Sequence, residues 1–158
     1  MPTRRDFLGL ALLGGASFAF ARPAAARPAR LVLSEAEWHR RLTSAQFAIL
    51  RGAGTEPAFT SPLLHEGRSG RFTCAGCGTV LFSSRAKYDS GTGWPSFWAP
   101  LGRSVRTSRD NSLGMTRIAV ACARCEGHLG HVFDDGPKPT GLRYCINGLA
   151  LAFVAGAA

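Results

Sequence analysis

The first apolar positions after residue 30 recur with the spacing of an α-helix. Ser34 and Glu37 have the pattern of a capping box, in which each side chain accepts a hydrogen bond from the other residue's backbone N–H. Trp38 and Leu42 follow four residues apart, so they share one face of a helix. The pattern therefore predicts a short amphipathic helix that begins after Ser34.

A second short helix is predicted directly after the first. Thr43 or Ser44 can cap its start, and Phe47 and Leu50 lie on one of its faces. The glycines and the proline of segment 52–57 end it, because glycine and proline terminate helices.

From Arg71 the pattern changes to brief apolar runs separated by Gly, Pro, Asp and Ser. Such runs are typical of short strands in antiparallel sheets. The turns between them include 135–137 and 139–141, where glycine and proline supply constrained backbone angles. The sequence therefore predicts a mainly β protein, with strands near 80–82, 116–120, 131–133, 143–146 and 149–154.

The N-terminal segment has the pattern of an export signal. Arg4 and Arg5 precede an uncharged apolar run, and Ala-x-Ala sites end at residues 21 and 26. The run is shorter than the roughly 20 residues of a membrane span. Paired arginines before Phe-Leu resemble the twin-arginine class of signal.

We therefore predict that residues 1–26 are a twin-arginine-type signal peptide, cleaved near residue 21 or 26. Residues 27–158 then form one domain, which the twin-arginine export machinery carries folded to the periplasm. Cleavage leaves no stable membrane anchor. An uncleaved N-terminal anchor helix is the alternative.

Composition and charge narrow the class of partner. The chain has 158 residues, enough for one domain with an apolar core. Without residues 1–26 it keeps 16 basic and 9 acidic residues, a net charge of +7. The basic residues are scattered among Gly, Ser and Thr, whereas a nucleic-acid binder clusters them on one face. We predict a solvated surface and no nucleic-acid partner.

Four of the five cysteines form two Cys-x-x-Cys pairs with 44 residues between them: Cys74, Cys77, Cys122 and Cys125. Two such pairs match the tetrahedral, sulfur-preferring coordination of a structural zinc ion. Four thiolates around one zinc(II) carry a net charge of −2. Two disulfides are the alternative, because exported proteins meet an oxidising environment. Folding before export would let zinc load in the reducing cytoplasm.

The fifth cysteine, Cys145, lies in a segment that alternates as a strand. Arg143, Cys145 and Asn147 therefore share one face. A neighbouring arginine favours the thiolate, which is the nucleophilic form of cysteine, and the amide of Asn147 can hydrogen-bond a polar substrate atom. An inert buried thiol is the alternative.

Two further segments carry side chains suited to a site around Cys145. His128 and His131 lie three apart, and a histidine near a cysteine can donate a proton at neutral pH. Trp94 stands between Gly93 and Pro95, in a turn that exposes it toward a cleft. A large aromatic ring there suits an apolar group such as a methyl. Phe97 and Trp98 fit a core equally well.

Several ordered motifs then match one known family. Residues 34–154 resemble the peptide-methionine (R)-S-oxide reductases, the methionine sulfoxide reductase B family. The resemblance rests on both cysteine pairs and on the segments at 54–57, 89–97, 114–117, 128–133, 135–141 and 143–147.

The resemblance implies a fold of two antiparallel β-sheets of the β-tent, Mss4-like kind, with short N-terminal helices and a structural zinc remote from the active site. It implies that Cys145 attacks the sulfoxide sulfur and becomes a sulfenic acid. Trp94 then holds the methyl, and the sulfoxide oxygen is oriented and protonated by His131, His128 and Asn147. Arg143, on the strand face of Cys145, is also predicted to bind the substrate. The implied substrates are oxidised proteins that carry methionine R-sulfoxide.

Two positions depart from the pattern of many relatives. Thr92 stands where they carry a resolving cysteine, so we predict regeneration by an external, thioredoxin-like thiol reductant. Ala119 stands where they often carry an acidic residue, so the resemblance does not predict which side chains support the active-site residues here.

Two other functions compete with this interpretation. A non-enzymatic zinc-knuckle module that binds protein or nucleic acid would not need Cys145. A thiol-disulfide oxidoreductase would use one Cys-x-x-Cys pair for catalysis, and the loss of Cys74 would then remove activity but not the fold.

Overall fold

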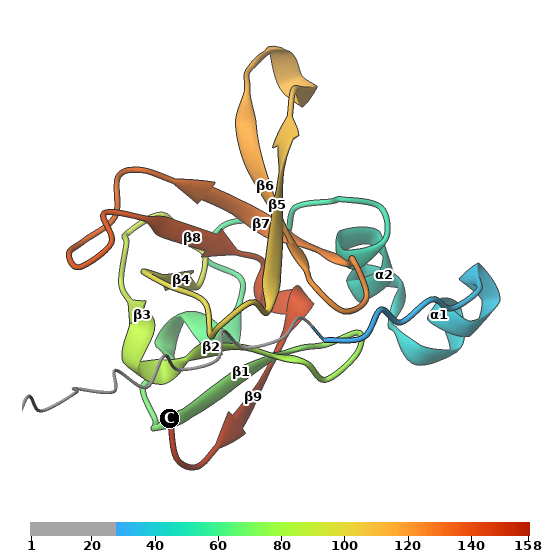
Figure 1. Ribbon diagram of the computed structural model, residues 1–158, viewed down its shortest axis with the longest axis horizontal. Helices are drawn as coiled ribbons and strands as arrows, with labels where there is room; N and C mark the ends of the chain where they lie inside the picture. Colours follow the sequence, from blue (N-terminus) through green and yellow to red (C-terminus); the bar gives the residue numbers. More distant parts are fainter. Residues whose placement is uncertain (1–27) are drawn as a thin grey trace, which may run out of the picture.

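The computed structural model describes residues 28–158 (Figure 1). The predicted signal peptide and its cleavage sites lie outside the described residues. In the part of the chain that is described, no helix is long and apolar enough to span a membrane.

Two short helices open the described chain. Helix α1 (Glu35–Arg41) has the predicted capping box of Ser34 and Glu37, which is therefore confirmed. Helix α2 (Ser44–Leu50) has a second capping box, formed by Thr43 and Gln46. Thr43 is thus the cap, and Ser44 is the first helical residue.

The rest of the chain forms two antiparallel sheets (Figure 1). The three-stranded sheet has the order β2-β1-β9, and the six-stranded sheet has the order β3-β4-β8-β7-β6-β5. The first sheet comprises β1 (Gly70–Cys74), β2 (Val80–Ser83) and β9 (Leu151–Ala155). The second comprises β3 (Lys87–Tyr88), β4 (Ser96–Phe97), β5 (Val105–Asp110), β6 (Arg117–Cys122), β7 (His128–Phe133) and β8 (Arg143–Ile146).

Single turns of 3₁₀-helix connect several of these elements: η1 (Pro62–His65), η2 (Ser84–Ala86), η3 (Ser112–Gly114) and η4 (Gly148–Ala150). The β5–β6 hairpin extends from the body of the molecule, with η3 at its tip (Figure 1).

Aromatic residues hold the two sheets together. The ring of Phe97 on β4 stacks on Phe82 of β2 at 4.3 Å and meets the edge of Phe72 of β1 at 4.9 Å, both between ring centroids. All three side chains are fully buried. Burying a Phe side chain contributes about 1.5–3 kcal/mol, so this contact stabilises the packing of one sheet on the other.

The predicted fold class is confirmed: the protein is mainly β, with two antiparallel sheets and short N-terminal helices. The strand at 149–154 is displaced, since η4 occupies its first residues and β9 begins at Leu151. Strands β1, β3 and β4 were not among the predicted strands, and neither was β5. Four of its six residues are exposed and polar, so its sequence carries no apolar signal, and it is a strand because β6 pairs with it along its length.

Candidate active site and metal centre

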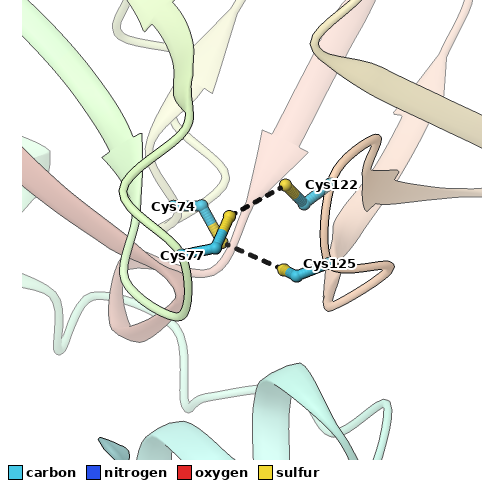
Figure 2. A group of neighbouring side chains, drawn as sticks. All are labelled: Cys74, Cys77, Cys122 and Cys125. Carbon is cyan, nitrogen blue, oxygen red and sulfur yellow. Dashed lines mark hydrogen bonds between the residues drawn. The ribbon is translucent and has the colours of Figure 1, made fainter. Parts of the chain in front are cut away.

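The four paired cysteines converge where the two sheets meet (Figure 2). Their sulfur atoms all lie within 4.8 Å of one another. The shortest contacts join one pair to the other, at 3.7 Å from Cys74 to Cys125 and 3.6 Å from Cys77 to Cys122.

These distances fit metal ligands and not disulfides. Sulfurs around a tetrahedral zinc, each about 2.3 Å from the metal, lie about 3.8 Å from one another. A disulfide bond is about 2.0 Å long, and all five cysteines are free in the structure. The group can therefore hold a metal ion, as the sequence predicted.

The two cysteine pairs have the same backbone turn. In the first, the N–H of Gly78 donates to the carbonyl of Cys74, and the N–H of Cys74 donates to Thr79. In the second, Glu126 donates to Cys122, and Cys122 donates to Gly127. The residue after each pair, Gly78 or Glu126, has a positive φ. Each turn presents two sulfurs to a common centre, so the sequence signal at both pairs has one structural cause.

Three arginines surround these turns. Arg41 of α1 donates to the carbonyl of Gly76 at 3.5 Å, and Arg51, which caps α2, donates to that of Cys125 at 2.9 Å. Arg124, inside the second pair, donates to Cys77 at 3.1 Å. We call these residues the arginine collar. These contacts hold the backbone of the two turns in place around the four sulfurs.

Cys145 lies outside this cluster, in a row of residues that crosses the six-stranded sheet. It pairs with His131 on β7 and with Ser96 on β4, and His131 pairs with Ala119 on β6. Directly opposed residues of antiparallel strands point to the same face, with their Cβ atoms about 4.5–5.5 Å apart. The strand register therefore brings Cys145 and His131 together.

This face of the sheet carries a cleft of about 120 Å³. Its walls include Thr55, Trp94, Arg117, His131, Cys145 and Asn147. Pockets for drug-sized ligands occupy about 300–1,000 Å³, so the volume of this cleft suits a single side chain. Gly130 also lines it, and a Cβ at that position would collide with the carbonyl oxygen of Cys145.

Cys145 is held as a thiol in the free protein. Burial raises the pKa of its thiol, and this effect outweighs the hydrogen bond from Thr92 and the charge of Arg143, which both lower it. The Oγ1 of Thr92 lies 3.9 Å from the sulfur. A nucleophile in this setting must lose its proton when the substrate binds, so the cleft needs a proton acceptor.

Of the predicted catalytic and substrate-binding residues, His128 and Arg143 do not line the cleft. Arg143 is bound to an acidic residue instead. Its guanidinium forms two hydrogen bonds with Asp135, at 2.7 and 2.8 Å, and lies 4.4 Å from the ring centroid of Phe133. It shares a strand face with Cys145, as the sequence indicated, but it is occupied by a carboxylate. Burial raises the pKa of the Cys145 thiol by more than Arg143 lowers it, although Arg143 does lower that pKa, as the sequence indicated.

The two histidines have different surroundings. His131 lines the cleft, and its Nε2 lies 2.7 Å from Asp110 Oδ2. His128 packs against His131 with ring centroids 5.4 Å apart. Burial first, and then the charge of His131, lower the pKa of His128 to about 4. His128 is therefore uncharged at neutral pH and supports the ring of His131 without being a cationic acid.

Trp94 and Asn147 are joined through Glu56. The indole N–H of Trp94 donates to the carbonyl of Glu56 at 3.1 Å, and the backbone N–H of Glu56 donates to Asn147 Oδ1 at 2.9 Å. The carboxylate of Glu56 is buried and accepts hydrogen bonds from the backbone of Gly148 and Leu149. One residue thus positions both the aromatic wall and the amide of the cleft.

The loop that carries Trp94 depends on Gly93. Its φ is +92°, and a Cβ there would lie 2.9 Å from the ring of Phe59. The carbonyl of Gly93 also accepts a hydrogen bond from the N–H of Phe59 at 2.8 Å. A residue with a side chain would displace this contact and, with it, the indole.

Sequence reasoning missed the roles of Asp110 and Glu56. Glu56 was noted only as part of a matching motif, and its burial is the property that reveals its function. Asp110 gave no signal, because its contact with His131 crosses β6 and depends on the register of three strands.

Together these features define a small β-sheet protein with a four-cysteine cluster that can hold a metal ion and one separate, half-buried cysteine in a cleft beside a histidine and a tryptophan. Comparison with known proteins agrees with this class. The SelR domain family matches residues 42–155.

A relative named peptide methionine sulfoxide reductase MsrB, from Bradyrhizobium diazoefficiens, is 55% identical over 123 residues, which is 77% of this chain and 88% of the relative. One of the same name from Leptospira interrogans is 53% identical over 121 residues, 76% of this chain and 92% of the relative. The chloroplastic peptide methionine sulfoxide reductase B1 of Arabidopsis thaliana is 53% identical over 75% of this chain and 59% of its own length.

The chain therefore belongs to the methionine sulfoxide reductase B family, which has the SelR domain. The family resemblance drawn from the motifs is confirmed, and so is the prediction of an enzyme of this type.

Proposed function

We propose that this protein reduces the R epimer of protein-bound methionine sulfoxide to methionine, with Cys145 as the nucleophile. The observation that carries the proposal is the register that sets Cys145 directly opposite His131 in a cleft with Trp94. The family relationship supports the substrate class.

The reaction transfers one oxygen atom and two electrons. The sulfur of Cys145 attacks the sulfoxide sulfur, while the thiol proton passes to the sulfoxide oxygen. The S–O bond of the substrate breaks and a new S–O bond forms on Cys145. The products are methionine, reduced by two electrons, and the sulfenic acid of Cys145, oxidised by two. His131 lies beside Cys145 and carries the proton between the two groups.

The cleft distinguishes the two epimers because three of its residues contact the sulfoxide from different sides. The methyl packs on the Trp94 indole, the oxygen points toward His131, and Cys145 attacks from the remaining side. In the other epimer the methyl and the oxygen exchange places, which puts a polar oxygen against the indole and a methyl against the imidazole.

Turnover of separated R and S epimers of a methionine sulfoxide peptide tests this proposal. We expect reduction of the R epimer to be faster by at least about 100-fold, because a mismatched polar group loses its hydrogen bonds in an apolar contact. Activity on the S epimer alone, measured by chromatography of the products, would contradict the proposed function.

Zinc is the metal that best fits the four-cysteine site. The site offers four soft sulfur ligands, and its shortest sulfur–sulfur distances of 3.6 and 3.7 Å are close to those around a tetrahedral zinc ion. Zinc bound there would have a structural role, because the cluster excludes Cys145. The cleft itself needs no metal for the step described above.

An external thiol regenerates Cys145. The four other cysteines belong to the metal site, and the side chain 3.9 Å from the reactive sulfur is the threonine Thr92. A reductant thiol attacks the sulfenic acid, giving a mixed disulfide and water. A second thiol then releases Cys145 and forms the disulfide of the reductant. A thioredoxin-like protein supplies both thiols.

Thr92→Cys is expected to convert the enzyme to an intramolecular disulfide mechanism. The wild-type Thr92 oxygen is 3.9 Å from Cys145 Sγ, and Gly91 and Gly93 flank it with positive φ angles, so a sulfur there has room to close the bond. After one turnover without reductant, mass spectrometry should show one added oxygen on wild-type protein and a disulfide to Cys145 in the variant.

Thr92→Ser is the matched control, since it keeps the hydroxyl and should behave as wild type. An intramolecular disulfide in wild-type protein with its metal bound would rule out the external reductant.

We also propose that the protein acts in the periplasm after twin-arginine export. Arg4, Arg5 and the apolar run to residue 21 support this route, and it allows the metal site to form before export. Fractionation of cells that produce the full chain tests it, and recovery in the cytoplasm alone would contradict it.

A further inference from the structure

The carboxylate of Asp110, at the end of β5, contacts the cleft residue His131 from across β6. Its Oδ2 lies 2.7 Å from His131 Nε2 and 2.8 Å from an Nη2 of Arg117. Its Oδ1 accepts the backbone N–H of Ser112 at 2.9 Å. Both oxygens are therefore engaged, and the side chain is held from three directions.

The strand register explains this contact. Asp110 pairs with Arg117 on β6, Arg117 and Ala119 lie two residues apart on one face of that strand, and Ala119 pairs with His131 on β7. The side chain directly opposite His131 is thus a methyl group. Asp110 reaches over this small residue, so the carboxylate that contacts the imidazole comes from β5.

Asp110 is ionised at neutral pH. Hydrogen bonds from Ser112 and His131, together with the charge of Arg117, hold the pKa of Asp110 well below its usual range. An ionised carboxylate can only accept hydrogen bonds. Nε2 of His131 must therefore carry a hydrogen, and Nδ1 is the ring nitrogen left for chemistry.

We propose that Asp110 is the positioning residue of His131: it keeps a hydrogen on Nε2 and thereby makes Nδ1 the atom that moves the proton from the Cys145 thiol to the sulfoxide oxygen. This inference rests on the proposed function and adds to it which of the two imidazole nitrogens transfers the proton. A carboxylate that fixes a histidine tautomer and stabilises the imidazolium has the same role in serine proteases.

The proton is conserved in this step. Neutral His131 has a lone pair on Nδ1, which accepts the thiol proton of Cys145 and gives an imidazolium paired with Asp110. The imidazolium returns that proton from Nδ1 to the sulfoxide oxygen as the S–O bond breaks. Asp110 keeps its charge throughout, and His131 ends in the tautomer in which it began.

Asp110→Asn is the variant to test. It preserves an acceptor for Ser112 N–H, which supports η3, but removes the charge that fixes the imidazole. We expect kcat for the R-sulfoxide to fall by about 10- to 100-fold, which does not exceed the rate enhancement that a positioned general acid or base usually provides. We expect KM to change by less than about threefold. Glu66→Gln is the matched control, because Glu66 forms an equally close ion pair with Arg68 outside the cleft.

Two readouts separate positioning from a structural role. In nitrogen NMR of the resting wild-type protein above pH 8, Nε2 of His131 should be the protonated ring nitrogen, and Asp110→Asn should give a mixture of tautomers. In a double-mutant cycle, Asp110→Asn should lower kcat by less than about twofold when His131 has already been replaced by alanine.

A wild-type imidazole protonated on Nδ1 would overturn the inference, and so would an undiminished effect of Asp110→Asn in the His131→Ala background. The NMR readout needs no turnover, so it remains decisive if the protein proves inactive on the R epimer. Failure of the proposed function is thereby distinguished from failure of this inference.

Discussion

Replacing Cys145 by serine is expected to lower turnover of methionine R-sulfoxide by at least about 10⁴-fold, the scale of losing the nucleophile of a concerted catalytic unit. A serine hydroxyl is far less nucleophilic than a thiol and cannot store the transferred oxygen as a sulfenic acid. Steady-state assays with a chemical thiol reductant measure the loss directly.

The same variant should keep its fold, because serine and cysteine have similar shapes and Cys145 lies outside the metal cluster. Its thermal midpoint and metal content should match those of wild type. Undiminished turnover in Cys145→Ser would end the proposed mechanism. It would favour the alternative in which this cysteine has no role.

Removing a metal ligand is expected to unfold the protein. Structural zinc contributes about 10–16 kcal/mol of apparent binding free energy in small domains, whereas a whole domain is stable by about 5–15 kcal/mol. Cys74 lies on β1 of the small sheet and Cys122 on β6 of the large one. Loss of the metal therefore releases the junction between the sheets and the turns against which α1 and α2 pack.

Circular dichroism of Cys74→Ser, or of wild type with a strong chelator, checks this expectation. Both should lose the cooperative thermal transition, and zinc added back to the chelated wild type should restore it. An intact fold with activity lost would instead indicate that the Cys-x-x-Cys pair is catalytic, as in a thiol-disulfide oxidoreductase. An equally stable metal-free protein would contradict the structural role of the site.

The sequence predicted the parts of the molecule whose signals are local. The capping box at Ser34 depends on residues three apart, and each cysteine turn is defined within six residues. Both are visible without a structure. The convergence of the two cysteine pairs followed from the coordination chemistry of one ion.

Long-range hydrogen bonds could not be read in this way. Arg143 shares a strand face with Cys145, but Asp135, across the turn before β8, takes its guanidinium. Likewise, the partner of His131 is set by how β5, β6 and β7 align. Register decides which of many carboxylates meets a given side chain, and no local pattern encodes it for an exposed, polar strand such as β5.

The cysteine cluster inside the arginine collar affects the net charge of this basic protein. Four thiolates around a divalent metal would carry a net charge of −2, and Arg41, Arg51 and Arg124 hydrogen-bond the backbone carbonyls of the turns around that centre. Such a centre would offset part of the cationic excess of the protein and lower the net charge that polyanions in solution meet. The isoelectric point of about 10.4 therefore overstates the field that DNA, RNA or an acidic membrane would experience at the surface of the metal-loaded protein.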